Sequence, residues 1–288
     1  MTAKRADFRF TERLRVRWAE VDMQRVVFNG HYLLYIDTAV AGWWRAMALP
    51  YHATMERLDG ELFVRKATLE YHAGARYDDL LDVGIRTAKV GNTSMLLAAA
   101  VMRGDQVLVE GELVYVFADP HATTSRPVPD ALRQVMLDFE AGQPMVQVRV
   151  GPWAELGADA RAIRTEVFVL EQKIPAEMEW DEADATCLHA VAYNRFGLPL
   201  ATGRLLEHVP GVAKIGRMAV RASMRGGRIG REVLDALMQA ARERGDREAL
   251  LHAQTSAAAF YSRAGFVTRG AQFEEAGIPH VEMVRALS

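Results

Sequence analysis

The sequence has almost none of the features that mark extracellular or membrane proteins. It contains one cysteine, Cys187, which excludes an intrachain disulfide and suits a reducing compartment. The first residues lack the apolar core of a signal peptide, and no apolar run approaches the roughly 20 residues needed to span a bilayer. We therefore expect a soluble, cytoplasmic protein with no membrane partner.

An excess of basic charge is also lacking. The chain has 35 Lys and Arg against 37 Asp and Glu, and neither half carries the basic excess of a protein that binds nucleic acid regardless of sequence. We therefore expect no nucleic-acid partner. Hydrophobic residues make up 50% of the chain and charged residues 25%, which excludes a disordered or fibrous protein. At roughly 150 residues per domain, this length predicts two domains.

A break in the pattern suggests where the two domains meet. Three prolines interrupt residues 119–131, and a short helical pattern then carries Leu132, Val135, Met136 and Phe139 on one face. Gly142 and Pro144 stop that helix, and a strand-like run follows at once. We therefore expect one domain over residues 1–143 and a second over 144–288.

The first half predicts one buried helix against an antiparallel sheet. Residues 32–47 place a broad apolar stripe, including Trp43 and Trp44, on one side of a helix. Strand patterns cover residues 14–21, 62–71, 81–90, 94–102 and 107–117. A helix this rich in tryptophan packs most simply on the sheet. The two tryptophans either line an apolar pocket or belong to the core.

The second half alternates helices and strands and predicts a mixed α/β domain. Helical patterns cover residues 158–171, 229–244 and 256–264, strand patterns cover 187–194, 199–206, 212–220 and 248–253, and a final strand pair follows. A polar loop fills residues 173–185.

The first chemical signal lies at the start of the buried helix. Asp22 follows a predicted strand, and small and polar residues lead into the helix. Free amides at a helix N-terminus can polarise a carbonyl oxygen, and a nearby carboxylate can attack a thioester or activate water. The alternative is that Asp22 only caps a loop, where aspartate is common.

This segment resembles the signature of hotdog-fold acyl-CoA thioesterases of the 4-hydroxybenzoyl-CoA thioesterase-like group. The matching residues are Asp22, the pair Val26-Val27, Asn29 and Tyr32, and the resemblance continues through 70–83 and 91–94 to cover about 10–140. Two departures are Arg25, at a position usually held by glycine, and Asn29, which replaces the histidine of one subgroup.

The resemblance implies an α+β hotdog domain, a long helix wrapped by antiparallel sheet, that hydrolyses an acyl-CoA. It implies that Asp22 is the nucleophile or general base, that Asn29 orients substrate or water, and that amides near Gly30 and His31 form the oxyanion site. Arg76 and Lys89 are candidates to bind the phosphates of coenzyme A, or else are solvated surface charges. Hotdog domains pair their long helices, so we expect a homodimer or a higher oligomer.

The second chemical signal is a glycine-rich turn between a strand and a helix, at residues 218–231. Ile229 opens an amphipathic helix, and successive amides at such a start form an anion cradle that glycines make accessible. The alternative is a plain strand-to-helix connection.

This turn resembles the acetyl-CoA pyrophosphate loop of the GNAT N-acetyltransferases. Arg225 and Gly230 match the ends of the family pattern, whereas Arg228 stands at its middle glycine. Residues 254–266 and 164–172 also resemble family segments, so the likeness covers about 146–286. It implies a mixed α/β GNAT domain that transfers an acetyl group from acetyl-CoA to an amine acceptor.

The resemblance also implies the site residues. The loop formed by Arg225, Gly226, Gly227, Arg228, Ile229 and Gly230 would bind the cofactor phosphates. Strand amides from Met218 to Val220 would hold the pantetheine and polarise the thioester, Gln254 would be a further cofactor contact, and Tyr261 would protonate the departing thiolate.

The general base of the acetyltransferase remains open among several acids. The candidates are Glu171, Glu177, Glu179, Asp181 and Glu207. The acidic loop 177–184 either attracts a cationic amine or is simply solvated. We interpret His252 and His280 as structural or surface residues and Cys187 as a core thiol. No cluster has metal-ligand spacing, so we expect no metal.

Together these observations predict a bifunctional acyl-CoA enzyme that uses acetyl-CoA or coenzyme A as co-substrate. One alternative is that a single domain is catalytic and the other is a CoA-binding regulatory or scaffold module. Another is a scaffold with no activity.

Overall fold

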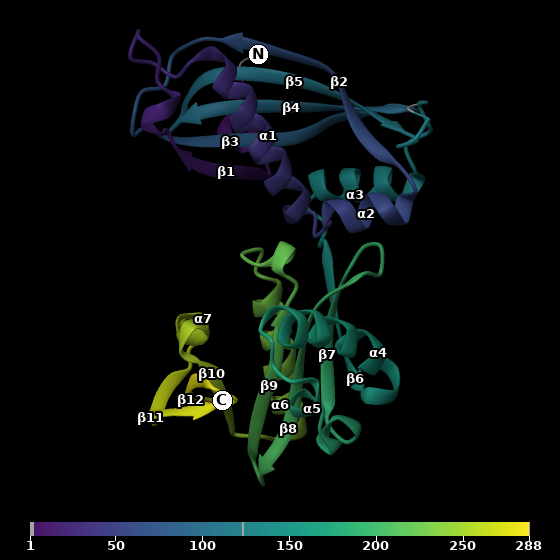
Figure 1. The fold of residues 1–288 in the computed structure, drawn as a ribbon, viewed down its shortest axis with the longest axis vertical. Helices are drawn as coiled ribbons and strands as arrows, with labels where there is room; N and C mark the ends of the chain where they lie inside the picture. The colour runs from purple at the N-terminus through teal and green to yellow at the C-terminus, as the bar shows by residue number, and fades with distance from the viewer. Residues whose placement is uncertain (1–2, 123, 288) are drawn as a thin grey trace. The chain divides into compact units, whose positions relative to one another are not determined.

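The computed structural model describes residues 3–122 and 124–287 and divides the chain into two compact units, Met1–Met145 and Val146–Ser288 (Figure 1). Each unit contains its own sheet. None of the helices in the described ranges has the length and apolarity that crossing a membrane requires.

The N-terminal unit is a five-stranded antiparallel sheet with one long helix packed against it. Its strand order is β1-β3-β4-β5-β2. The elements are β1 (Phe10–Arg15), α1 (Asn29–Ala46), α2 (Tyr51–Leu58), β2 (Glu61–Tyr71), β3 (Leu80–Val90), β4 (Ser94–Arg103), β5 (Gln106–Ala118) and α3 (Asp130–Glu140), with 3-10 turns at Arg5–Asp7 and Trp18–Glu20. This is the α+β hotdog architecture that the sequence predicts.

Helix α1 buries the apolar stripe that its sequence carries. Its inner side contacts β1, β3 and β4, where Ile36 and Trp43 are fully buried. The rings of Trp43 and Trp44 meet edge to face with centroids 5.5 Å apart. Both tryptophans are therefore core residues and do not line an open pocket. Leu33 and Leu34, on the outer side of the helix, are exposed.

The first strand differs from the prediction. We expected a strand over residues 14–21, but β1 covers Phe10–Arg15 and pairs with β3, and a 3-10 turn follows. The reason is tertiary: the buried Glu20 carboxylate accepts the Arg17 amide at 2.7 Å and the Tyr35 hydroxyl at 2.7 Å, which curls the chain after Val16. Asp22 therefore lies in a loop and not at a strand end.

The C-terminal unit is a seven-stranded sheet in the order β11-β12-β10-β9-β8-β7-β6, in which only β9 and β10 run parallel. Its strands are β6 (Val146–Pro152), β7 (Leu188–Asn194), β8 (Pro199–Val209), β9 (Val212–Val220), β10 (Glu248–Gln254), β11 (Val267–Glu275) and β12 (Ile278–Ala286). Its helices are α4 (Trp153–Arg164), a π-helix (Thr165–Glu171), α5 (Ala176–Glu179), α6 (Ile229–Arg244) and α7 (Ala258–Arg263), with 3-10 turns at Glu182–Ala185, Ala222–Met224 and Thr255–Ala257. The mixed α/β prediction is confirmed.

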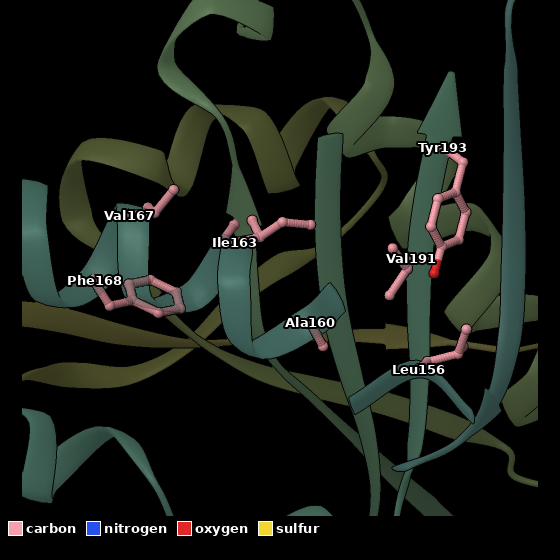
Figure 2. Close-up of a cluster of buried hydrophobic side chains, with 8 residues drawn as sticks. Leu156, Ala160, Ile163, Val167, Phe168, Val191 and Tyr193 are labelled. Atoms are coloured by element: carbon pink, nitrogen blue, oxygen red, sulfur yellow. The ribbon is translucent and has the colours of Figure 1, made fainter. Parts of the chain in front are cut away.

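Helix α4 continues directly into the π-helix, and together they cover one part of this sheet. Figure 2 shows side chains of both helices lying beside β7: Leu156, Ala160, Ile163, Val167, Phe168, Val191 and Tyr193 form one buried cluster. Helix α6 packs on strands β6 to β9 through Val233, Leu234 and Leu237, which are fully buried. The buried stripe of α6 matches its predicted span of 229–244.

Candidate functional site

Strands β9 and β10 separate shortly after they begin, which opens the sheet of the C-terminal unit. They pair only from Val212 to Ile215 and from Glu248 to Leu251. Beyond Ile215, β9 remains paired with β8, but an irregularity in that pairing places Arg217 at a φ of +52°. Bulges bend a strand and increase its twist. Within the part of the chain that the structure describes, no strand therefore pairs with the edge of β9 from Gly216 onward on the β10 side.

A cavity of about 1240 Å³ lies at this split. It is lined by nine of the residues that the sequence predicts to bind acetyl-CoA: Met218, Val220, Arg225, Gly226, Arg228, Ile229, Gly230, Gln254 and Tyr261. Gly227, the tenth, is not among the lining residues. Segments of β9, β10, α6 and α7 that are far apart in sequence thus meet around one space.

The glycine-rich turn presents free backbone donors to this cavity. Among the described residues, the amides of Ile229 and Gly230 have no hydrogen-bond acceptor, as expected for the first turn of a helix. A Cβ at Gly230 would lie 3.1 Å from Val220 Cγ2, so glycine lets α6 pack closely on β9. Arg228 caps α6 with a φ of +66°, a conformation that favours glycine. This explains the family preference for glycine there.

Arg225 is held by an acid from the π-helix. Its guanidinium donates to both carboxylate oxygens of Glu171, at 2.7 and 2.6 Å, and its Nε donates to the Val220 carbonyl at 3.0 Å. The hydrogen bond from Arg225 lowers the pKa of the Glu171 carboxyl. Glu171 is therefore a counter-ion of Arg225 and is poorly suited to be the general base.

Tyr261 lines the cavity and packs against two aromatic side chains. Its ring packs edge to face on Phe260 and Phe266, with centroids 4.9 and 6.1 Å away. Burial raises the pKa of its hydroxyl to about 12, so the group is protonated at neutral pH and can donate a proton. Nearby, the Gln254 amide donates to Gln172 Oε1 at 3.0 Å, which ties β10 to the end of the π-helix.

The acidic loop 177–184 is largely neutralised by arginines. Its ion pairs are Glu179 with Arg164 (2.5 Å) and Arg217 (3.3 Å), Asp181 with Arg204 (2.6 Å) and Arg217 (3.3 Å), and Asp184 with Arg164 (2.7 Å) and Arg204 (2.8 Å). Burial raises the pKa of Glu179, whereas the hydrogen bond from Arg204 lowers that of Asp181. These three carboxylates form a structural network and do not present a free negative surface. Glu177 and Glu207 are exposed and do not line the cavity.

Among the described residues, two groups of side chains each bring together three atoms that could bind a metal ion: Asp184, Cys187 and His189, all buried, and Glu70, His72 and Glu110 in the N-terminal unit. The sequence expectation did not identify either group. In the first group Asp184 already accepts from two arginines, and His189 Nε2 lies 2.9 Å from the Asp184 carbonyl. Burial raises the pKa of the Cys187 thiol to about 11, in keeping with a core thiol.

In the N-terminal unit, Asp22 begins a tight turn. The Arg25 amide donates to the Asp22 carbonyl at 3.0 Å, the Asp22 amide donates to the Val26 carbonyl at 2.9 Å, and Asp22 Oδ1 accepts the Gln24 amide at 2.8 Å. Arg25 closes the turn with a φ of +62°, which explains why glycine is usual there. The carboxylate thus caps its own loop, as the alternative reading expected, while Oδ2 accepts no hydrogen bond from the described residues.

The start of α1 supplies free amides at some of the predicted positions. Among the described residues, the amides of Asn29 and Gly30 have no hydrogen-bond acceptor. The His31 amide, by contrast, donates to the Phe28 carbonyl at 2.9 Å, so it is not free to bind an oxyanion. Asn29 is exposed, and its backbone carbonyl accepts a hydrogen bond from the Tyr71 hydroxyl at 3.1 Å.

Other contacts hold this helix start in place. The Tyr32 hydroxyl accepts the Ala75 amide at 2.7 Å, and the Ala75 carbonyl accepts the Val27 amide at 2.9 Å. Tyr32 therefore anchors the loop after β2. The candidate phosphate contacts Arg76 and Lys89 are both exposed. The sequence did not identify the structural role of the buried Glu20, because its partner Tyr35 lies beyond the loop that joins Glu20 to α1.

The comparisons with known proteins match both units. A family model described as the acetyltransferase (GNAT) domain matches residues 163–287, and one described as the thioesterase superfamily matches residues 24–114, beginning just after Asp22. The uncharacterized N-acetyltransferase YjcF of Bacillus subtilis is 38% identical over 128 residues, which are 44% of this chain and 90% of that protein.

Two solved structures each resemble one part of the chain. An acyl-CoA N-acyltransferase from Pseudomonas aeruginosa is 34% identical, with a TM-score of 0.44, and the match covers 49% of this chain and 99% of that one. A 1,4-dihydroxy-2-naphthoyl-CoA thioesterase from Synechocystis is 19% identical, with a TM-score of 0.42, and the match covers 46% of this chain and 97% of that one. From the family models and the YjcF relationship, the chain belongs to the GNAT acetyltransferase family through its C-terminal unit and carries a hotdog domain of the thioesterase superfamily in its N-terminal unit.

Proposed function

We propose that the protein is a bifunctional acyl-CoA enzyme, in which the hotdog domain hydrolyses an acyl-CoA thioester and the GNAT domain transfers an acetyl group from acetyl-CoA to an amine. The cavity at the β9–β10 split carries the acetyltransferase half of this proposal, because it gathers the free α6 amides, the free edge of β9 and Tyr261 around one space. The buried single Cys187 is consistent with the cytoplasmic location that we also propose.

In the GNAT domain, each part of the cavity has one role. The amides of Ile229 and Gly230 and the positive end of the α6 dipole bind the pyrophosphate. The unpaired β9 edge from Met218 to Val220 supplies amides for the pantetheine and the thioester carbonyl. The amine attacks the carbonyl carbon, and Tyr261 gives its proton to the departing sulfur.

In the hotdog domain, Asp22 is the nucleophile or general base. Its Oδ2 atom accepts no hydrogen bond from the described residues and is therefore available for this role. Of the two amides expected to bind the oxyanion, our proposal keeps that of Gly30 and drops that of His31, which is already hydrogen-bonded. Asn29 positions the substrate or water. Arg76 remains a proposed contact for the phosphates of the acyl-CoA.

We propose that two copies of the chain pair through the hotdog domain. The outer side of α1 exposes Leu33 and Leu34, and the edge strand β2 exposes Val64 and Tyr71. A soluble monomer rarely leaves so many large apolar side chains exposed around one helix and one sheet edge. Pairing would cover them and complete the site beside Asn29.

A second candidate is that only one domain is catalytic and the other is a CoA-binding regulatory or scaffold module. The observation that favours it is that Asp22 caps its own turn, which is a sufficient structural role for this carboxylate. Under this reading the GNAT domain alone would turn over.

The test is release of free thiol from a panel of acyl-CoA esters, with and without a mixture of amines, by wild type, Asp22→Asn and Tyr261→Phe. If both domains are active, thiol release without amine should be lost only in Asp22→Asn. The additional thiol release that depends on amine should fall only in Tyr261→Phe. Amine-dependent release alone would support the second candidate. If no thiol is released under either condition while coenzyme A still binds, the protein would be a CoA-binding scaffold without enzymatic activity.

A further inference from the structure

A cluster of titratable side chains lies at the cavity and has no role in the proposed transfer. His252 of β10, Glu275 of β11 and His280 of β12 all line the cavity. The Phe273 ring packs against both histidines, with centroids 4.9 Å from His252 and 6.0 Å from His280. The hairpin turn between β11 and β12, with Ala276 and Gly277 at φ values of +52° and +74°, places Glu275 at its end.

The register of the sheet places His252 at the apex of the split. Leu251 is the last β10 residue that pairs with β9, opposite Ile215. His252 is therefore the first residue of β10 beyond the parallel pairing, across from the bulged segment of β9 at Gly216 and Arg217. Its side chain is 28% exposed, so it is accessible from the cavity.

Glu275 orients the imidazole ring. His252 Nδ1 lies 3.4 Å from Glu275 Oε2, a long hydrogen bond of the kind that tightens when substrate binds. If Nδ1 carries the proton for this bond, Nε2 has a free lone pair. A carboxylate that fixes the tautomer of a basic histidine is a recurring arrangement in enzymes.

The acids that the sequence offers as general base are each unsuited to that role. Glu171 is bound bidentately by Arg225. Glu179 and Asp181 are each paired with two arginines. Glu177 and Glu207 lie off the cavity. A carboxylate held by arginine is a weak proton acceptor, because proton uptake would break its ion pairs.

We propose that His252, oriented by Glu275, is the general base that deprotonates the amine acceptor. This inference rests on the proposed acetyl transfer. His252 accepts one proton from the ammonium group, and the neutral amine then forms the N–C bond to the thioester carbonyl while the C–S bond breaks. Tyr261 gives its proton to the sulfur, and the second proton lost by the amine nitrogen restores the tyrosine. The products are the amide, the free thiol and one proton that passes from His252 to solvent.

Charged groups on the neighbouring strands also act on this ring. Across the pairing to β12, His252 Nε2 lies 3.8 Å from Glu282 Oε2, and Glu282 is itself held by Arg269 at 2.6 Å. The other titratable groups around it are Glu275, His280, His208 and Lys214. A pH profile of the reaction must therefore be compared among variants and not read from wild type alone.

The experiment compares two kinds of acceptor with acetyl-CoA. Primary alkylamines are ammonium ions at neutral pH and need a base, whereas hydroxylamine is uncharged there and does not. The variants are His252→Gln, Glu275→Gln and, as a matched control, His121→Gln, an exposed histidine of the N-terminal unit that does not line the cavity. Affinity for acetyl-CoA is measured for each by calorimetry.

We expect His252→Gln to lower kcat with alkylamines by about 10²-fold at neutral pH and by less as the pH rises, with a loss of less than about tenfold for hydroxylamine and unchanged acetyl-CoA affinity. Glu275→Gln should show a smaller loss of the same kind, and His121→Gln none. An alkylamine rate that His252→Gln leaves intact would overturn the proposal, as would equal losses for both acceptors. Failure of the acetyl transfer itself is separate, because wild type would then release no thiol with either acceptor.

Discussion

The two units of the protein differ in how much of a site one chain provides. In the GNAT domain, β9, β10, α6 and α7 enclose a cavity of about 1240 Å³ within a single unit. In the hotdog domain, Asn29 is exposed at the start of α1, and large apolar side chains such as Phe28, Leu34 and Tyr71 are exposed around it. One unit encloses the first candidate site, whereas in our proposal a surface from another copy encloses the second.

The largest expected effect tests this difference directly. Leu34→Glu places a charge on the exposed side of α1, so it should prevent pairing and lower amine-independent thiol release by about 10²-fold, because a misplaced site loses reactive geometry. Amine-dependent release should be unchanged. Thiol release and analytical ultracentrifugation check both statements.

Leu137→Glu on α3 is the matched control, since Leu34 and Leu137 are each 47% exposed. It should leave the oligomer and the rates intact. A monomeric Leu34→Glu variant that hydrolyses acyl-CoA at the wild-type rate would show that one hotdog domain is sufficient.

The two units also differ in how they bury charge. Arg164 is 1% exposed and is bonded to both Glu179 and Asp184, whereas the buried Glu20 of the hotdog domain pairs with an exposed arginine, Arg17. Arg164→Ala should therefore destabilise the GNAT domain by about 3–5 kcal/mol, because it takes from each of two buried carboxylates one of its two arginine partners. Chemical denaturation measures this loss. Arg247→Ala, at an exposed site of the same unit, should cost less than about 0.5 kcal/mol, and an equal cost would show that burial is not the cause.

A third comparison concerns the two arginines at positions where glycine is usual. Arg25 and Arg228 have nearly equal φ values, +62° and +66°, but of the two it is Arg228 that lines the cavity at the β9–β10 split. A side chain in this conformation costs about 1–2 kcal/mol. Arg25→Gly and Arg228→Gly should therefore each stabilise the protein by roughly 1 kcal/mol in denaturant titrations. Only Arg228→Gly should change coenzyme A affinity. A change of affinity in neither variant would remove Arg228 from the phosphate site.

The smallest expected effect concerns the pair that holds Arg225. Glu171→Gln removes the counter-ion and leaves Arg225 free for phosphate, so coenzyme A should bind about two- to fivefold more tightly, the size expected for a half-exposed ion pair. Calorimetric titration checks this, with the exposed Glu182→Gln as control. Weaker binding would mean that Glu171 instead positions the guanidinium for the ligand.

Periodicity was sufficient to predict the elements whose pattern is local. Helix α6 lies over its predicted residues, and α1 and strands β2 to β5 begin or end within a few residues of expectation. In each case the apolar residues that become buried recur at regular spacing within one continuous segment, so the pattern can be recognised without knowing any distant contact. The first strand was wrong because Glu20 folds the chain back through a contact with Tyr35, which no local pattern contains.

The roles of charged residues were the least predictable part of the site. Glu179 and Asp184 look like an acidic loop in sequence, but their partners Arg164 and Arg204 lie on α4 and β8. His252 looked like a surface residue because its place at the apex depends on where β9 and β10 part. The glycine-rich turn, by contrast, is one continuous segment, so its place between a strand and a helix could be predicted from local sequence.

The short pairing between β9 and β10 has a consequence for the free protein. In residues 3–122 and 124–287, four residue pairs join the two halves of the sheet across the split, and the β9 amides beyond them have no strand partner on that side. A co-substrate that fills the split would supply hydrogen bonds in place of those that a paired strand would make. Its binding free energy would therefore also stabilise the local structure of β9. Amide hydrogen exchange along β9 should therefore slow sharply when coenzyme A is added. In this sense the proposed co-substrate would complete the sheet as an additional strand does.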